Sequence, residues 1–85
     1  MTWTVIVAKS AQKGLERIPV RDQDRIAAAL IEMAANPFAG DLRKLEGVEN
    51  GWRRRVGSYR IFFAVNHSLG TIAVSAILRR TSTTY

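Results

Sequence analysis

The sequence predicts an α+β fold in which a helix hairpin packs on one face of a small, mainly antiparallel four-stranded sheet. Three observations support this prediction. A short β-rich run, Trp3 to Ala8, opens the chain, two apolar stripes at helical spacing follow it, and three strand-like runs with alternating polarity occupy residues 51–79. The expected order of elements is therefore β-α-α-β-β-β.

Apolar residues recur at helical spacing in two stretches, residues 9–18 and 20–35. The stripe of the first stretch is made by Ala11, Leu15 and Ile18, and that of the second by Ile26, Leu30 and Met33. Ser10 is expected to cap the first helix with its side chain. Pro19 ends that helix and Asn36-Pro37 stops the second. Because the connection at Pro19 is so short, the two helices are expected to form an antiparallel hairpin lying on the sheet.

A Gly-Ser pair at residues 57–58 is one of the two-residue connections that favour a tight β-hairpin. Such a turn fixes which residues face each other across the two strands. It pairs Val56 with Tyr59, Arg55 with Arg60 and Arg53 with Phe62. Residues 71–79 are expected to form the last strand, and residues 38–50 are expected to be a loop.

Alternation along the strands divides the side chains between two faces of the sheet. The face under the helices is expected to carry the apolar set Trp52, Val56, Tyr59, Ile61, Phe63, Ile72, Val74 and Leu78. The open face is expected to carry Arg53, Arg55, Arg60, Phe62, Ser75 and Arg79. Arg54 falls on the apolar side, where it is expected to extend its stem over the edge of the helices and keep its head in water.

Positive charge is concentrated in the second half of the chain. Residues 52–85 contain six arginines and no Asp or Glu. Arg55 and Arg60 are expected to stand directly opposite each other, which is destabilising unless something negative lies between them. With no carboxylate expected nearby, the pattern indicates an external anion. The polymeric anion most available in a cell is nucleic acid.

Composition limits the class of protein. Eighty-five residues predict a single domain spanning 1–85. The chain has no cysteine and one histidine, His67, so a disulfide framework is excluded and neither a metal nor another cofactor is expected. No apolar run approaches the ~18 residues of a membrane span, which predicts a cytoplasmic protein with no membrane partner.

Several motifs occur in a characteristic order along the chain: Leu-Arg-Lys-Leu-Glu-Gly at residues 42–47, Gly-x-Tyr-Arg at residues 57–60, and Leu78-Arg79-Arg80 followed by a closing Tyr85. In these motifs and in its whole length the sequence resembles the RelE/ParE superfamily of bacterial toxins, and within it the RelE branch of ribosome-dependent messenger-RNA endonucleases. The resemblance implies a RelE-like microbial RNase fold, metal-independent cleavage of messenger RNA in the ribosomal decoding site, and a cognate RelB-like antitoxin.

The resemblance also implies site residues. The catalytic candidates are Arg53, Arg55, Arg60, Arg79 and Tyr85, and the RNA-binding candidates are Arg43, Lys44, Phe62 and Arg80. Arg60 is expected to stabilise the charge that develops on phosphorus, because a guanidinium binds phosphate oxygens bidentately. Arginine is a poor base, since its pKa above ~12 leaves almost no neutral form. Where related toxins often carry lysine this chain has Arg53 and Arg55, so Tyr85 is the expected proton-transferring group. It would act as the base if the arginines lower its pKa, with Arg79 assisting the leaving oxygen. The alternative is a site that mainly orients the RNA and stabilises charge, while the ribosome holds the strand in line for attack.

Two other functions remain open at this point. A ParE-like toxin would share the fold but inhibit DNA gyrase by binding it. A non-catalytic, basic RNA-binding or degenerate toxin would fit the absence of a lysine base.

Overall fold

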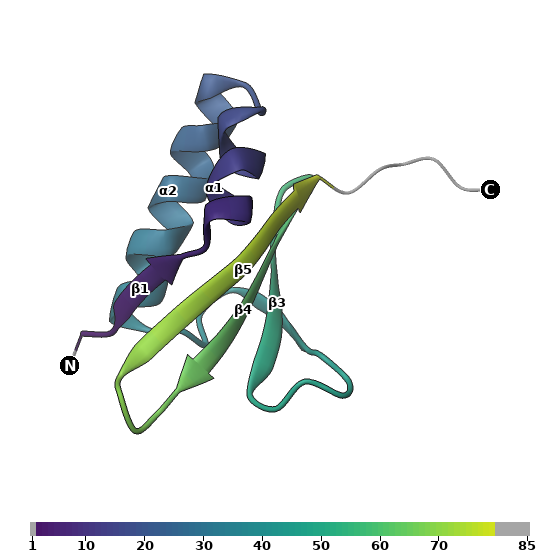
Figure 1. Cartoon of the computed structure of the whole chain (residues 1–85). Helices are drawn as coiled ribbons and strands as arrows, with labels where there is room; N and C mark the ends of the chain where they lie inside the picture. Colours follow the sequence, from purple (N-terminus) through teal and green to yellow (C-terminus); the bar gives the residue numbers. More distant parts are fainter. Residues whose placement is uncertain (1, 80–85) are drawn as a thin grey trace.

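The computed structural model describes residues 2–79, which form two helices and five strands (Figure 1). In chain order the elements are β1 (Thr4–Val7), α1 (Lys9–Glu16), α2 (Val20–Ala35), β2 (Asp41–Lys44), β3 (Gly51–Val56), β4 (Tyr59–Asn66) and β5 (Thr71–Arg79). The strands lie in the order β1-β5-β4-β3-β2, with β1 parallel to β5 and the other neighbours antiparallel. The predicted α+β class is confirmed, but the sheet has one strand more than expected.

The additional strand is β2, in the segment predicted to be a loop. It pairs with β3 in a register that sets Asp41 opposite Arg55 and Arg43 opposite Arg53. Its sequence, Asp-Leu-Arg-Lys, has a single apolar residue and therefore lacks the alternation that marks a longer strand. Short, charged strands of this kind are common at sheet edges, where they discourage pairing with other chains.

The central hairpin has the register that its turn predicts. Val56 pairs with Tyr59, Arg55 with Arg60 and Arg53 with Phe62. Gly57 has a φ of 58°, a left-handed conformation that glycine adopts without steric cost. A positive φ at the first of two turn residues is what a type II′ turn requires, and this turn matches the twist of the two strands.

A β-bulge in β5 changes which side chains of that strand face the helices. Phe62 pairs with Ala76 while Phe63 pairs with Val74, so Ser75 is an extra residue, and its Oγ donates a hydrogen bond to the Phe62 carbonyl at 3.3 Å. Beyond the bulge the alternation is reversed. Ile77 is 3% exposed and Leu78 is 54% exposed, the opposite of the prediction.

The bulge also moves Arg79. Its partner across the strands is Tyr59, which is buried under the helices, whereas Arg60 pairs with Leu78. Cross-strand partners share a face. The placement of Arg79 on the open face with Arg60 is therefore wrong, because one inserted residue shifts the phase of the strand by one.

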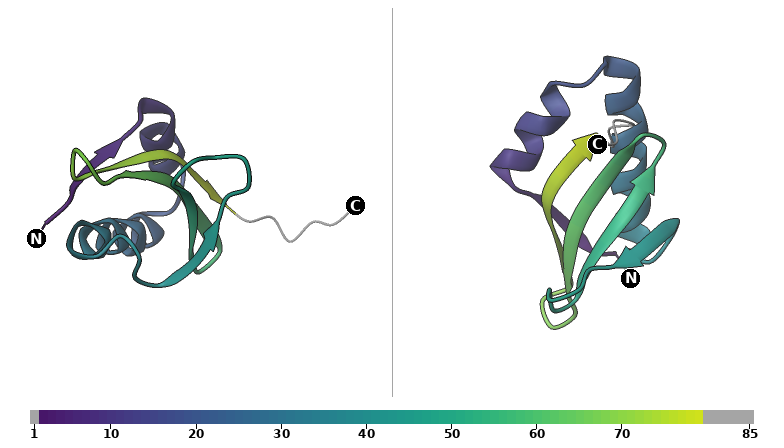
Figure 2. Two further views of the ribbon diagram at one scale, coloured as in Figure 1. Left: turned by 90° about the horizontal axis from the view of Figure 1, so that it is seen from below. Right: turned by 90° about the vertical axis from the view of Figure 1, so that its right-hand side faces the viewer.

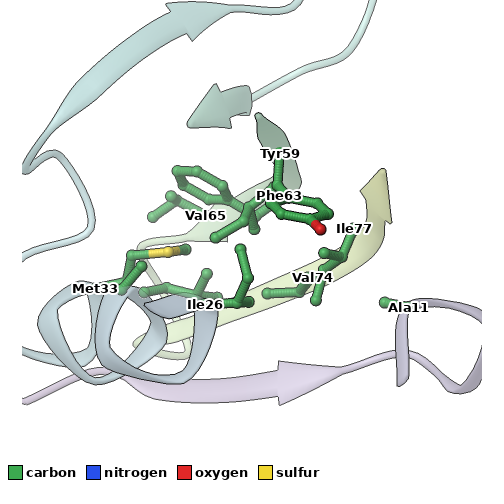
Figure 3. Packing of buried hydrophobic residues seen from close by; sticks show 11 residues of the cluster. Ala11, Ile26, Met33, Tyr59, Phe63, Val65, Val74 and Ile77 are labelled. Carbon is green, nitrogen blue, oxygen red and sulfur yellow. The ribbon is translucent and has the colours of Figure 1, made fainter. Parts of the chain in front are cut away.

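The hydrophobic core lies between α2 and the sheet (Figure 3). Its largest fully buried side chains come from α2, β4 and β5, and they are Ile26, Met33, Ile61, Phe63, Ile72 and Val74. Trp52 is half-buried and packs against this cluster. In the right-hand view of Figure 2 the strands lie in front of α2, and no helix of the described residues covers their other face.

Helix α1 lies along β5 beyond the point where β1 ends. The Ser10 Oγ donates a hydrogen bond to the Ser75 carbonyl at 3.2 Å, and Ala11 is buried. Ser10 was expected to cap the helix, but the N-cap is Ala8, which makes no side-chain capping bond. The hydroxyl instead satisfies a carbonyl on the edge of β5 that β1 is too short to cover.

Replacing Gly14 with alanine is expected to destabilise the fold, although alanine favours helix by up to about 1 kcal/mol. A Cβ at this position would lie 2.8 Å from the Ile77 carbonyl oxygen of the β5 backbone. Relieving that overlap must shift α1 from the sheet, so we expect a net loss of about 1–3 kcal/mol in urea unfolding. Exposed Lys13→Ala on the same helix is the control, and a more stable Gly14→Ala variant would contradict this packing.

Candidate functional site

The open face of the sheet presents side chains in rows that cross the strands, because paired residues share a face. One row consists of Asp41, Arg55, Arg60 and Leu78, and the next of Arg43, Arg53, Phe62 and Ala76. Three strands thus bring four arginines together. Their sequence spacing along β3 and β4 predicted three of these positions, and the strand β2 adds the fourth.

These two rows enclose a pocket of about 190 Å³. It is lined by Asp41, Arg43, Arg53, Arg55 and Arg60. Four guanidinium groups against one carboxylate give the pocket a net positive charge. Arg43, Arg53 and Arg55 form no ion pair with any of residues 2–79. A site of this size and charge suits a phosphate group, which guanidinium groups bind through paired hydrogen bonds.

Asp41 is a site residue that sequence reasoning missed. The expectation that no carboxylate lies near the facing pair Arg55 and Arg60 is wrong, since Asp41 stands opposite Arg55 on the neighbouring strand. The sequence predicts a loop over residues 38–50, whereas Asp41 lies on the strand β2. The only signal in these residues is a single apolar residue between two charged ones, Asp41-Leu42-Arg43, in which Leu42 faces the core and its neighbours are exposed.

Other predicted site residues lie outside the pocket. Lys44 pairs with Trp52 and therefore faces the opposite side of the sheet from Arg43. Arg79 lies on the helix side, as described above. Arg80 and Tyr85 fall outside the described residues. Phe62 is half-buried in the row of Arg53, at the border between the pocket and an apolar groove.

The groove next to the arginine pocket has a volume of about 400 Å³. Its lining comes from the loop after β2 and from β4 and β5, and consists of Leu45, Val48, Phe62, Phe63, Ala64, Ala73, Ser75, Ala76 and Leu78. The groove lies on the open face, because the bulge in β5 turns Leu78 away from the core.

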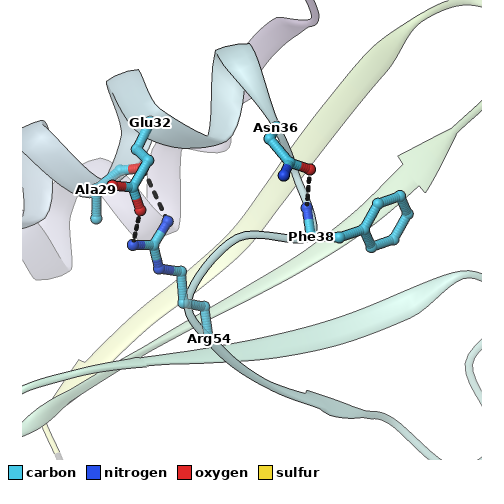
Figure 4. Close-up of polar contacts among 5 residues, drawn as sticks. All are labelled: Ala29, Glu32, Asn36, Phe38 and Arg54. Carbon is cyan, nitrogen blue, oxygen red and sulfur yellow. Dashed lines mark hydrogen bonds and ion pairs between the residues drawn. The ribbon is translucent and has the colours of Figure 1, made fainter.

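Arg54 has a structural role (Figure 4). It is 8% exposed, donates a hydrogen bond from Nη1 to the Ala29 carbonyl at 3.3 Å, and forms an ion pair through Nη2 with Glu32. The prediction that its head stays in water is wrong, because α2 supplies both a carbonyl and a carboxylate above it. Of the three consecutive arginines in β3, the middle one binds the helix and the outer two face the pocket.

Tyr59 links the turn of the hairpin to α2. Its Oη donates a hydrogen bond to Asp22 Oδ2 at 2.9 Å. Burial raises the pKa of Tyr59 above its ordinary value, the hydrogen bond to Asp22 and the charge of Asp22 raise it further, and the charge of Arg79 opposes them. This opposing effect is consistent with an Arg79 position on the helix side of the sheet.

The raised pKa of Tyr59 predicts how stability changes with pH. In the unfolded chain the phenol loses its proton near pH 10, whereas in the folded chain it keeps the proton to higher pH. The free energy of unfolding should therefore be unaffected by this group below about pH 10 and fall above it. Tyr59→Phe should lower the melting temperature at pH 7 and remove this alkaline component. Equal alkaline slopes for the wild type and the variant would contradict the assignment.

Among residues 2–79, no three His, Cys, Asp or Glu side chains gather into a group that could hold a metal ion. Neither described helix has the length and apolar character needed to cross a membrane.

Comparison with known proteins identifies the family. Residues 5–83 match the family described as ParE toxin of type II toxin-antitoxin system, parDE. The chain is 34% identical over 82 residues to Toxin RelE3 of Methanocaldococcus jannaschii, a match that covers 92% of this chain and 91% of that protein.

Solved structures agree with this match. The RelE-RelB complex of Pyrococcus horikoshii contains a chain of 26% identity with a TM-score of 0.86, covering 98% of this chain and all of that one. The RelB-RelE complex of Methanococcus jannaschii gives 31% identity and a TM-score of 0.74, covering 88% and 89%. The chain therefore belongs to the RelE/ParE superfamily of type II toxin-antitoxin toxins.

Proposed function

We propose that this toxin is an endoribonuclease that cuts messenger RNA in the ribosomal decoding site and so inhibits translation. The observation that supports this best is the pocket in which Arg43, Arg53, Arg55 and Arg60 converge from three strands. The likeness to RelE toxins of archaea favours the same branch of the superfamily. Because the proposed substrate is messenger RNA on ribosomes, the proposed site of action is the cytoplasm.

The proposed reaction uses the RNA's own 2′-hydroxyl as nucleophile. Its oxygen attacks the adjacent phosphorus, giving a cyclic phosphate and a free 5′-hydroxyl, with no need for a metal. The protein then has three tasks: to accept the proton of the 2′-hydroxyl, to stabilise extra charge on the phosphoryl oxygens, and to protonate the leaving oxygen.

Arg60 is proposed for the second task. It is half-buried on β4, one of the three strands that form the pocket, with Arg55 opposite it on β3 and Arg53 in the adjacent row. Its planar guanidinium remains charged at physiological pH and can bind two phosphoryl oxygens at once. Preorganised charge of this kind does not have to reorganise during the reaction, which is why it lowers the barrier.

The remaining predicted site residues are proposed to act on other parts of the RNA or on the leaving oxygen. Phe62 is proposed to stack on a base, since it pairs with the pocket residue Arg53 and lines the neighbouring apolar groove, and since base stacking tolerates any sequence. Tyr85, which has a transferable proton, is proposed to protonate the leaving oxygen. Arg79, Arg80 and Lys44 are proposed to contact flanking phosphates or the ribosome rather than the reacting phosphorus.

A cognate antitoxin is the second proposed partner. The structural relatives include complexes of RelE toxins with RelB antitoxins. A chain of net charge +6 with an apolar groove beside a cationic pocket suits an acidic, amphipathic segment that folds on binding.

The proposed function is tested by primer-extension mapping of transcripts after brief induction of the toxin. Cuts within the codons of translated messages are expected, together with growth arrest. Inhibition of purified gyrase with intact transcripts would replace the proposal with the ParE-like activity that the family description also allows. Expression without growth arrest would indicate a non-catalytic protein.

A further inference from the structure

Asp41 is the one pocket-lining residue, among those described, that is not an arginine. We propose that its carboxylate recognises the 2′-hydroxyl beside the scissile phosphate and accepts its proton. This assignment depends on the proposed endoribonuclease activity and adds to it both the missing base and a means of distinguishing RNA from DNA.

The register places Asp41 in one row with two of the arginines that line the pocket. Asp41 pairs with Arg55, and Arg55 pairs with Arg60, so the three residues form one row across adjacent strands. Neighbouring strands lie about 4.8 Å apart. When a phosphate is held between Arg55 and Arg60 in a reactive arrangement, the attacking 2′-oxygen of the ribose lies about 3–3.5 Å from phosphorus. That oxygen can therefore lie between the phosphate and the neighbouring strand β2.

The carboxylate is available to accept a proton. Asp41 is exposed and makes no side-chain hydrogen bond or ion pair with residues 2–79. The arginines that share the pocket cannot act as bases, because they do not lose their protons at physiological pH.

Other titratable groups are held elsewhere in the fold. His67 contacts the rings of Trp3 and Phe38, with centroid separations of 5.6 and 6.2 Å, and is not among the pocket residues. The Tyr59 hydroxyl is hydrogen-bonded to Asp22 on the helix side. Within the described residues, Asp41 is therefore the group in the pocket that fits the first catalytic task.

The charges in the pocket explain why a site for nucleic acid can contain a carboxylate and why that carboxylate favours RNA over DNA. A lone carboxylate would repel a polyanion, but here the surrounding guanidinium groups outnumber it four to one. The Asp41 carboxylate still needs a hydrogen-bond donor when a nucleic acid strand fills the pocket. RNA supplies the 2′-hydroxyl at that place and DNA does not. Asp41 should therefore favour RNA by accepting a hydrogen bond and disfavour DNA by facing a phosphate without one.

In the proposed step, the Asp41 carboxylate takes the proton of the 2′-hydroxyl as the oxygen forms a bond to phosphorus. The bond between phosphorus and the 5′-oxygen breaks, and the leaving oxygen takes a proton, which water can supply. The products are a 2′,3′-cyclic phosphate and a 5′-hydroxyl. Asp41 then returns its proton to solvent.

Asp41→Asn tests this assignment, because it keeps the size of the side chain but removes its capacity to take a proton. The matched control is Asp24→Asn, which removes an exposed carboxylate from α2 on the other side of the sheet. Single-turnover cleavage of messenger RNA on programmed ribosomes should fall on the order of 10²-fold or more for Asp41→Asn and stay within about threefold for the control.

A binding measurement separates this role from a merely structural one. RNA and DNA oligonucleotides of the same sequence, with deoxyuridine in the DNA, are titrated against each variant. The wild type should prefer RNA, and in Asp41→Asn the preference should decrease by about tenfold as the DNA binds more tightly. The control should keep the wild-type preference.

The outcomes distinguish the two proposals. Normal cleavage and an unchanged RNA preference in Asp41→Asn, with an active wild type, would overturn the assignment of Asp41 and leave the endoribonuclease proposal standing. A wild-type protein that leaves messages uncut on ribosomes would overturn the proposed function and, with it, the role of Asp41 in cleavage.

Discussion

Arg60→Ala is expected to lower the rate of messenger-RNA cleavage by about 10²–10³-fold without unfolding the domain, because it removes a pocket-lining guanidinium that is proposed to stabilise the charge on the reacting phosphate. Single-turnover cleavage on programmed ribosomes measures the rate, and a melting curve measures the fold. The same variant should no longer arrest growth when it is expressed.

Two further variants show whether the loss of cleavage rate is due to the geometry of the Arg60 guanidinium or to its charge. Arg60→Lys keeps the charge but loses the bidentate fork, so it should recover only part of the rate. Arg21→Ala removes an exposed arginine from α2 and should cleave at the wild-type rate. Unimpaired cleavage by a folded Arg60→Ala variant would contradict the assignment of this residue.

Arg54→Ala is expected to have the largest effect on stability, a loss of about 2–4 kcal/mol in the free energy of unfolding. The side chain is buried, and its removal leaves a cavity beneath α2 as well as unpaired Glu32 and Ala29 acceptors. Glu32 is 55% exposed and can regain water, which keeps the loss below that of a fully buried pair. Urea unfolding monitored by tryptophan fluorescence measures the difference.

Arg54→Met tests whether the loss of stability in Arg54→Ala is due to lost packing or to the lost ion pair. Well-packed apolar residues often replace buried ion pairs without loss of stability. Since the buried Nε of Arg54 has no hydrogen-bond partner within residues 2–79, methionine should recover most of the stability that alanine loses. If Arg54→Ala unfolded at the wild-type urea concentration, the ion pair and the hydrogen bond shown in Figure 4 would have no role in stability.

The central hairpin could be predicted because its turn chemistry is local. A glycine and a serine between two strand-like runs fix the register, and the register alone places Arg53, Arg55 and Arg60 on one face. The two apolar helix stripes could be predicted for the same reason, since each is complete within one continuous stretch of sequence.

The errors all arise where the determining contact is distant in sequence. The apolar residues Ile77 and Leu78 are adjacent, so alternation could not show which of them faces the core, and the bulge at Ser75 decides it. Asp41 joins the pocket because β3 offers β2 an edge for pairing. Arg54 is neutralised by Glu32, which lies 22 residues earlier in the chain.

The central claim is that the arginines of the open face bind the phosphates of RNA, and the salt dependence of binding tests it most directly. The affinity for a short 2′-O-methyl RNA, which cannot be cut by this reaction, is measured across a range of salt concentrations for the wild type and single alanine variants. Each of Arg43→Ala, Arg53→Ala, Arg55→Ala and Arg60→Ala should reduce the slope of log affinity against log salt by about 0.7, whereas Arg54→Met should leave it unchanged. Equal slopes for the wild type and all four pocket variants would contradict the account.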